Sequence, residues 1–196
     1  SQKLLYISLD FCKILKFISL DFCKKRWFIC LDNFDLLFLQ TETKRIFNMY
    51  CKRLIDKYLS EWASRDIHKP LLLRGARQVG KSTAVQELSK KFDTFVEINF
   101  EKQPKYKALF KGDLDVKRIV PQISAMYGTS IRPGKTLLFL DEIQECPEAI
   151  MALRFFKEDM PELHVIAAGS LLEFALKELP TFGVGRIHSM FMYPMT

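Results

Sequence analysis

From residue 50 onward the hydrophobic positions follow helical and strand spacing in turn. Apolar side chains recur every three or four positions in residues 50–65 and 81–92, which predicts two amphipathic helices. Short apolar runs predict buried strands at residues 71–75, 94–100, 136–141, 164–170 and 187–193. Further helical segments, including residues 148–159, lie between the strands. This alternation predicts an α/β fold, with a parallel sheet covered by helices on both faces.

Residues 1–48 follow a different pattern. The heptapeptide ISLDFCK occurs at residues 7–13 and again at 18–24, and a related copy, ICLDNFD, lies at 29–35. The segment contains no Gly or Pro, so it lacks the residues that turn a β-hairpin. We therefore expect a repeat-bearing extension that is disordered or is not native sequence, for example translated upstream DNA with Met49 as the true start. Residues 49–196 then form the folded domain.

Composition narrows the class of protein. The chain is 48% hydrophobic and 27% charged, which is ordinary for a globular protein. No run approaches the ~18 apolar residues of a membrane span, and five cysteines without a CxxC pair indicate a reducing compartment. We therefore expect a cytoplasmic protein without a membrane contact. The net charge of +7 is spread along the chain. Even the basic segment 101–118 includes acids, which favours a solvated face over a nucleic-acid patch.

The residues GARQVGKS at 75–82 match the phosphate-loop pattern G-x-x-x-x-G-K-[S/T], and they lie between a predicted strand and a predicted helix. Glycines let the backbone wrap around phosphate oxygens, which the exposed N–H groups and the positive end of the helix bind. Lys81 should reach the β- and γ-phosphates, and the Ser82 hydroxyl should ligate Mg²⁺. The expected binding loop comprises Gly75, Ala76, Arg77, Gln78, Val79, Gly80, Lys81, Ser82 and Thr83.

A second motif is the acidic pair that ends the apolar strand before it, in LLFLDEIQ at 137–144. The C-terminal ends of parallel strands share one sheet edge with the phosphate loop, so Asp141 should face the Mg²⁺ site. Glu142 is then placed to hold the attacking water as a general base. Gln144 stands where a GTPase would carry Gly, and the guanine motif N-K-x-D is absent, which favours ATP.

Three other polar residues have two interpretations each. Ser170 follows the strand expected beside the phosphate-loop strand, where it is a γ-phosphate sensor, the N-cap of the next helix, or both. Arg186 follows a glycine turn and is either an arginine finger, in cis or from a neighbour, or an ordinary surface residue. Arg77 either neutralises phosphate or binds a neighbouring acid.

The segments RGARQVGKST, LLFLDEIQ, AAGSLLEFAL and VGRI…YPMT occur in this order. Together they resemble the prokaryotic AAA+-type ATPases whose ATPase core precedes a C-terminal domain of unknown function. The resemblance covers residues 50–196 and implies an additional-strand P-loop fold that binds ATP and Mg²⁺. By this resemblance Asp141 is the Mg²⁺ aspartate, Glu142 the catalytic glutamate, and Ser170 and Arg186 read the γ-phosphate. Relatives often carry Pro where Gly183 stands, and they continue beyond the YP motif, so we expect a truncated chain.

These features predict a Mg²⁺-dependent ATPase domain that switches or moves an attached domain. Its partner would be an unknown protein or the chain's own C-terminal domain, and an oligomer is compatible with the arginine-finger interpretation. Two alternatives stay open. The first is a nucleotide-gated binding module with slow hydrolysis. The second is a DNA-processing motor, whose DNA affinity would fall as salt rises.

Overall fold

A computed structural model of the protein describes Tyr50 and residues 52–170, 172 and 185–194. The chain divides after Met49, and Tyr50–Thr196 forms the unit considered below. The ISLDFCK repeat, the expected start at Met49 and the helix expected after Ser170 lie outside the described residues, so the predictions about them stay predictions.

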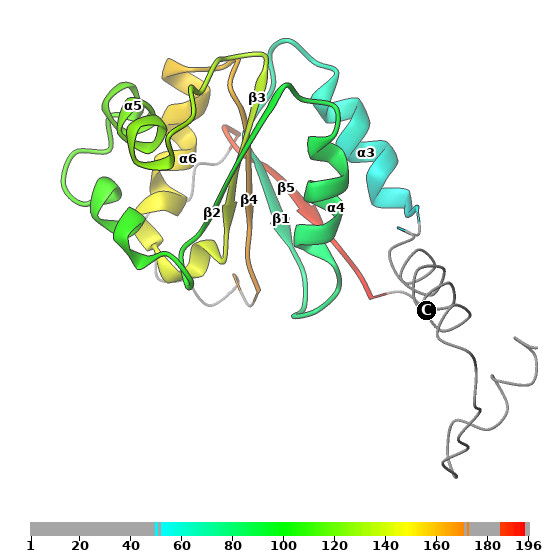
Figure 1. The fold of residues 1–196 in the computed structure, drawn as a ribbon. Coiled ribbons are helices and arrows are strands. Elements are labelled where there is room, and N and C mark those ends of the chain that lie inside the picture. Colours follow the sequence, from blue (N-terminus) through cyan, green and yellow to red (C-terminus); the bar gives the residue numbers. More distant parts are fainter. Residues whose placement is uncertain (1–49, 51, 171, 173–184, 195–196) are drawn as a thin grey trace, which may run out of the picture. The chain divides into compact units, whose positions relative to one another are not determined.

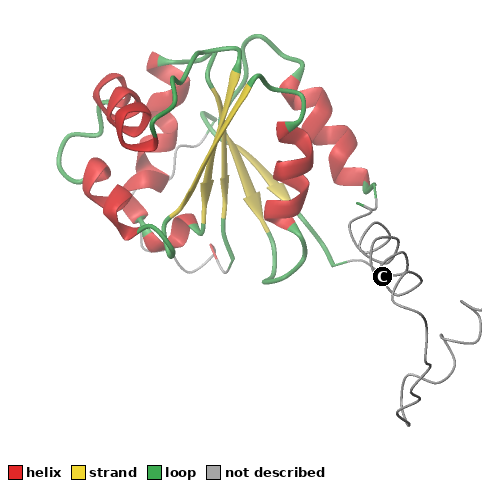
Figure 2. Cartoon of the chain, viewed as in Figure 1, coloured by secondary structure: helices red, strands yellow, loops and turns green. Residues whose placement is uncertain are grey.

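Strands and helices alternate through the described part (Figures 1 and 2). The strands are β1 (Leu71–Arg74), β2 (Thr94–Asn99), β3 (Thr136–Asp141), β4 (His164–Ala168) and β5 (His188–Phe191). The α-helices are α3 (Leu54–Ala63), α4 (Lys81–Ser89), α5 (Val116–Tyr127) and α6 (Pro147–Asp159), with 3-10 helices η1 (Pro104–Phe110) and η2 (Ile143–Glu145). Within the described residues the predicted strands and helices are present, and only their ends differ by a few residues, as expected where helices and strands fray.

The strands form one parallel sheet in the order β2-β3-β4-β1-β5. Strand β4 lies between β3 and β1, which confirms the predicted insertion beside the phosphate-loop strand. The register pairs Asn99 with Asp141 and Leu73 with Ala168. Because the strands are parallel and in this register, the C-terminal ends of β1, β2, β3 and β4 meet at one edge of the sheet.

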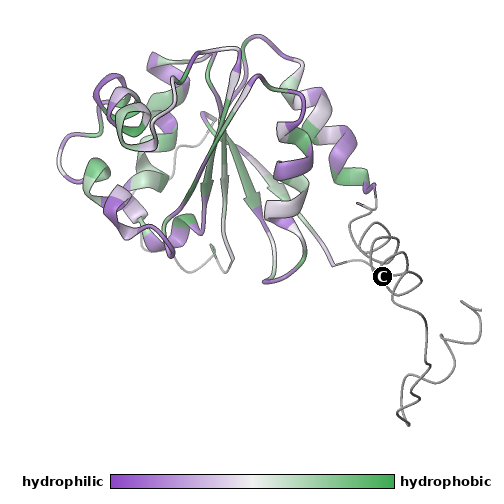
Figure 3. Ribbon diagram, viewed as in Figure 1, coloured by the Kyte–Doolittle hydropathy of each residue, from purple (hydrophilic) through white to green (hydrophobic). Residues whose placement is uncertain are grey.

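Helices cover both faces of the sheet, with α3 and α4 on one side and α5 and α6 on the other (Figure 1). Successive strand side chains point to opposite faces, so Leu71 and Leu73 pack against α3 and α4, while Leu72 packs against α5 and α6. All three are fully buried, and each contributes roughly 1.5–3 kcal/mol of hydrophobic free energy. Figure 3 shows hydrophobic residues along the central strands. In the described ranges no helix is long and apolar enough to cross a membrane.

The basic segment 101–118 is only partly the solvated face that composition predicts. Most of its lysines are exposed, but Tyr106, Phe110 and Val116 are buried in the core that α5 and α6 share. The side chain of Asp115 accepts a hydrogen bond from the backbone N–H of Lys117 and caps α5. The segment therefore packs onto the core directly after the C-terminal end of β2.

Candidate functional site

The loop between β1 and α4 turns at two glycines. Gly75 has φ 149° and Gly80 has φ 86°, backbone conformations that side chains disfavour. A Cβ on Gly75 would also lie 2.3 Å from the carbonyl oxygen of Met192, because the chain leaving β5 passes directly beside the loop. Gly80 caps the N-terminus of α4, so the loop's N–H groups and the positive end of the helix share one anion-binding corner.

Lys81 lies inside this corner, with only 7% of its side chain exposed. Its Nζ donates to the carbonyl oxygens of Gly75 and Ala76, at 3.1 and 2.7 Å. Burial lowers the pKa of the Lys81 ammonium, and the nearby carboxylates of Glu142 and Asp141 oppose that shift. A β- or γ-phosphate bound at the loop would compete for the same N–H donors.

Ser82 and Asp141 meet in space although 59 positions separate them. The Ser82 hydroxyl donates to Oδ2 of Asp141 at 3.1 Å, and the amide of Asn99 donates to the same oxygen at 3.1 Å. Burial raises the pKa of the Asp141 carboxyl, whereas these two hydrogen bonds oppose the rise.

A hydroxyl and one carboxylate suit Mg²⁺, which prefers hard oxygen ligands and completes its shell with water and substrate phosphates. Among the described residues no group of three or more His, Cys, Asp or Glu side chains gathers into a protein-only metal site. The residues at this corner therefore fit a metal that is shared with a bound phosphate.

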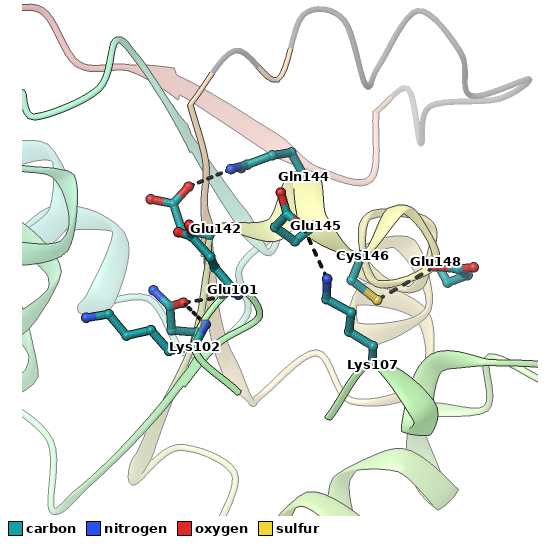
Figure 4. A network of polar contacts seen from close by, with 9 residues as sticks. Glu101, Lys102, Lys107, Glu142, Gln144, Glu145, Cys146 and Glu148 are labelled. Carbon is teal, nitrogen blue, oxygen red and sulfur yellow. Dashed lines mark hydrogen bonds and ion pairs between the residues drawn. The ribbon is translucent and has the colours of Figure 1, made fainter. Parts of the chain in front are cut away.

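Glu142 follows β3 in a left-handed backbone conformation, with φ 49° and ψ 48°. Its carboxylate accepts a hydrogen bond from the Gln144 amide at 2.5 Å (Figure 4). An open cleft of about 440 Å³ lies over the loop, a size within the usual range for ligand sites. The cleft is lined by Arg77, Gln78, Gly80, Lys81, Ser82, Thr83, Glu101 and Glu142.

Ser170 lies at the same sheet edge. The residue before it, Gly169, donates its N–H to the carbonyl oxygen of Leu73, the strand that leads into the loop. Ser170 is 2% exposed, and its hydroxyl oxygen has no hydrogen-bond partner among the described residues. The structure thus places Ser170 beside the loop's strand, while its role as sensor or N-cap stays a prediction.

Arg186 lies elsewhere. It precedes the N-terminal end of β5, where His188 pairs with Leu71, so it sits at the sheet edge opposite the phosphate loop. Its Nε forms an ion pair with Oε1 of Glu158 on α6, at 2.6 Å, and both side chains are substantially exposed. The structure does not bring Arg186 to the loop of its own chain. A role as an arginine finger supplied to a neighbouring copy stays a prediction.

Sequence reasoning missed Asn99 and Glu101. Asn99 ends its strand as Asp141 does, so the argument from shared strand ends would have found it. Its Oδ1 accepts the backbone N–H groups of Glu101 and Lys102, which turns the chain toward the cleft. No local signal indicates Glu101, because only that turn directs its side chain to the cleft.

The strand order, the loop after β1 and the acidic pair after β3 define the class: an α/β P-loop protein of the additional-strand type. A family model described as an AAA domain matches residues 67–196, more than half of the sequence, and the chain belongs to that family. Among solved structures it is similar to the Walker-type ATPase of Pyrococcus abyssi, with 18% identity and a TM-score of 0.49. That alignment covers 76% of this chain and 55% of the other, and it adds nothing to the family assignment. No curated protein matches the chain.

Proposed function

We propose that this AAA domain binds ATP with Mg²⁺ and hydrolyses it, and that the nucleotide state switches an attached domain. The observation that carries the proposal is the hydrogen bond from Ser82 to Asp141, which joins the phosphate loop to the acidic pair. Lys81 and Glu142 line the same cleft. The cleft thus contains a cation that can bind phosphate, a carboxylate that can serve as a base, and the Ser82 hydroxyl, which is hydrogen-bonded to Asp141.

Each residue has a distinct task in the proposed reaction. The loop N–H groups and Lys81 bind the phosphate oxygens and offset their charge. Ser82 and Asp141 would hold Mg²⁺, which would offset the negative charge of the phosphates. Glu142 orients the attacking water and accepts its proton, so that water displaces ADP from the γ-phosphoryl group.

A side-chain contact supports the coupling to an attached domain. Arg53, the N-cap of α3, donates from Nη1 to the carbonyl oxygen of Val79 in the phosphate loop. The same guanidinium donates from Nη2 to the carbonyl oxygen of Tyr193, beyond β5. A shift of the loop on binding phosphate would therefore reach both ends of the described domain directly.

The test is Glu142→Gln, assayed for ATP binding and for ATP hydrolysis. An amide keeps the size of the side chain but cannot accept the proton, so hydrolysis should slow by ~10²–10⁴ while ATP affinity is retained. The matched control is Glu145→Gln, because Glu145 lies three positions further on and pairs with Lys107 at the surface. Equal turnover in wild type and Glu142→Gln would contradict the proposed base.

Single-turnover kinetics separate hydrolysis from a slow nucleotide gate. The proposal predicts that bound ATP is converted to ADP in wild type much faster than in Glu142→Gln. If wild-type protein instead binds ATP tightly and converts it no faster than the variant does, the chain is a nucleotide-gated binding module.

A further inference from the structure

Gln144 is held at a junction between two strand ends. Its Nε2 donates to Oε2 of Glu142, and Figure 4 shows the amide reaching back to that carboxylate. The two residues are close in sequence, but only the left-handed turn at Glu142 folds their side chains together. This hydrogen bond uses Oε2 of Glu142, and the other carboxylate oxygen, Oε1, takes no part in it.

The amide oxygen of Gln144, Oε1, lies close to Gly169, the residue that follows β4. This oxygen is buried and has no hydrogen-bond partner among the described residues. A Cβ on Gly169 would lie 2.4 Å from this oxygen, far inside van der Waals contact. Gly169 does not belong to the glycines with positive φ. A side chain at position 169 would therefore have to displace the Gln144 amide, so the glycine matters here for space rather than for backbone conformation.

We propose that Gln144 is a positioning residue for the hydrolytic step, and that Gly169 provides the room that Gln144 needs. The proposal rests on the proposed ATPase function. A carboxylate that acts as a base must present one oxygen to the attacking water at hydrogen-bond distance. By binding Oε2, the Gln144 amide limits rotation of the Glu142 side chain and keeps Oε1 for the water.

The Gln144 amide occupies the space that Gly169 leaves open. Gly169 is bonded through its N–H to Leu73, in the strand that carries the phosphate loop. Through Gln144, the orientation of Glu142 would thus depend on β1, the strand that leads into the phosphate loop. The Glu142 carboxylate would then keep a constant distance from the bound phosphate. Hydrolysis requires this, because a misplacement of about 1 Å can slow the reaction by ~10²-fold.

The first test replaces Gln144 with Met, which has similar length and no amide. We expect kcat to fall ~10- to 100-fold while the dissociation constant for ATP stays within about twofold, because only orientation is lost. The matched control is Gln86→Met. Gln86 also donates to a glutamate, Glu97 at 3.2 Å, but on the exposed side of α4 and β2. This control should leave kcat unchanged.

The second test needs no nucleotide. Gly169→Ala should lower the melting temperature, because the new Cβ would lie 2.4 Å from Oε1 of Gln144 and 3.0 Å from the side chain of Leu172. In a Gln144→Ala background most of that cost should disappear, since the oxygen that the Cβ meets is gone. Gly169→Ala alone should also lower kcat, whereas adding it to Gln144→Ala should lower kcat no further.

The outcomes separate the positioning role from the proposed function. If wild-type protein hydrolyses ATP and Gln144→Met has the same kcat, the positioning role is wrong and the ATPase function stands. Additive melting-temperature changes for Gly169→Ala and Gln144→Ala would also overturn it. A wild-type protein that binds ATP without hydrolysing it would remove the proposed function and, with it, the role of Gln144.

Discussion

Lys81 illustrates how single residues set the chemistry of the cleft. Its ammonium is buried and donates to two carbonyl oxygens of its own loop, Gly75 and Ala76. Those bonds hold the side chain at the base of the cleft, and burial strengthens any charge that it presents to a phosphate. The cost of losing Lys81 therefore falls on phosphate binding more than on the fold.

We predict that Lys81→Ala weakens ATP binding by ~10- to 100-fold, since each charged hydrogen bond contributes ~1.5–3 kcal/mol. Titration of a fluorescent ATP analogue measures the effect. Lys90→Ala is the control, because Lys90 lies at the exposed end of the same helix and pairs with Glu87. Tight binding by Lys81→Ala would count against the assignment of the loop.

At the scale of elements, α3 is joined to the site through its first residues. Asp56 accepts hydrogen bonds from the backbone N–H of Arg53 and from the Tyr50 hydroxyl, at 2.6 Å each. Burial and the bond to Asp56 raise the pKa of Tyr50 well above its usual range, so its hydroxyl stays a donor. This cap orients Arg53 toward Val79 and Tyr193, and the helix start thereby supports the phosphate loop.

We predict that Arg53→Ala lowers the melting temperature by about 2–8 °C, because it removes two hydrogen bonds of roughly 1 kcal/mol each. ATP affinity should fall as well, since Val79 loses its support. Lys52→Ala, an exposed neighbour, should change neither quantity. Thermal unfolding with and without ATP measures both. An Arg53→Ala variant with wild-type ATP affinity would show that the loop needs no support from α3.

At the scale of the whole domain, the sheet edge opposite the site contains a buried pair of histidines. The rings of His68 and His164 stack at 3.9 Å, and Trp62 packs edge-on against both. Burial, aided by the neighbouring His164, lowers the pKa of His68 to about 4, and burial lowers that of His164 too. The pair joins the end of α3 to the start of β4, so its protonation affects the fold rather than the cleft.

We predict that stability falls as pH drops from about 6.5 toward 4. The unfolded chain binds protons on these histidines with pKa values near 6.5, whereas the folded domain keeps them neutral, so acid favours unfolding. Melting temperatures between pH 7.5 and 4.5 test this. His68→Gln should flatten the pH dependence, whereas the control His188→Gln, at an exposed position on β5, should not. An equally steep pH dependence in His68→Gln would contradict the assignment.

The strands, helices and phosphate loop could be predicted because their signals are local. Apolar spacing reports the period of a helix or strand, and the glycines and Lys81 of the loop act within one short segment. The insertion of β4 beside β1 also followed from the class of fold. The role of the glycine at 169 and the histidine pair were not predictable, because they depend on side chains that lie far apart in the sequence.

By itself, then, the sequence determined the type of each described element, and it predicted phosphate and metal chemistry for residues 75–83 and 141–142. Only the tertiary structure decided which atoms meet. It joined Ser82 to Asp141, placed Gln144 against Gly169 and put Arg186 at the edge away from its own loop. The physical reason is that these meetings depend on the strand register, and the register is set by core packing on both faces of the sheet at once.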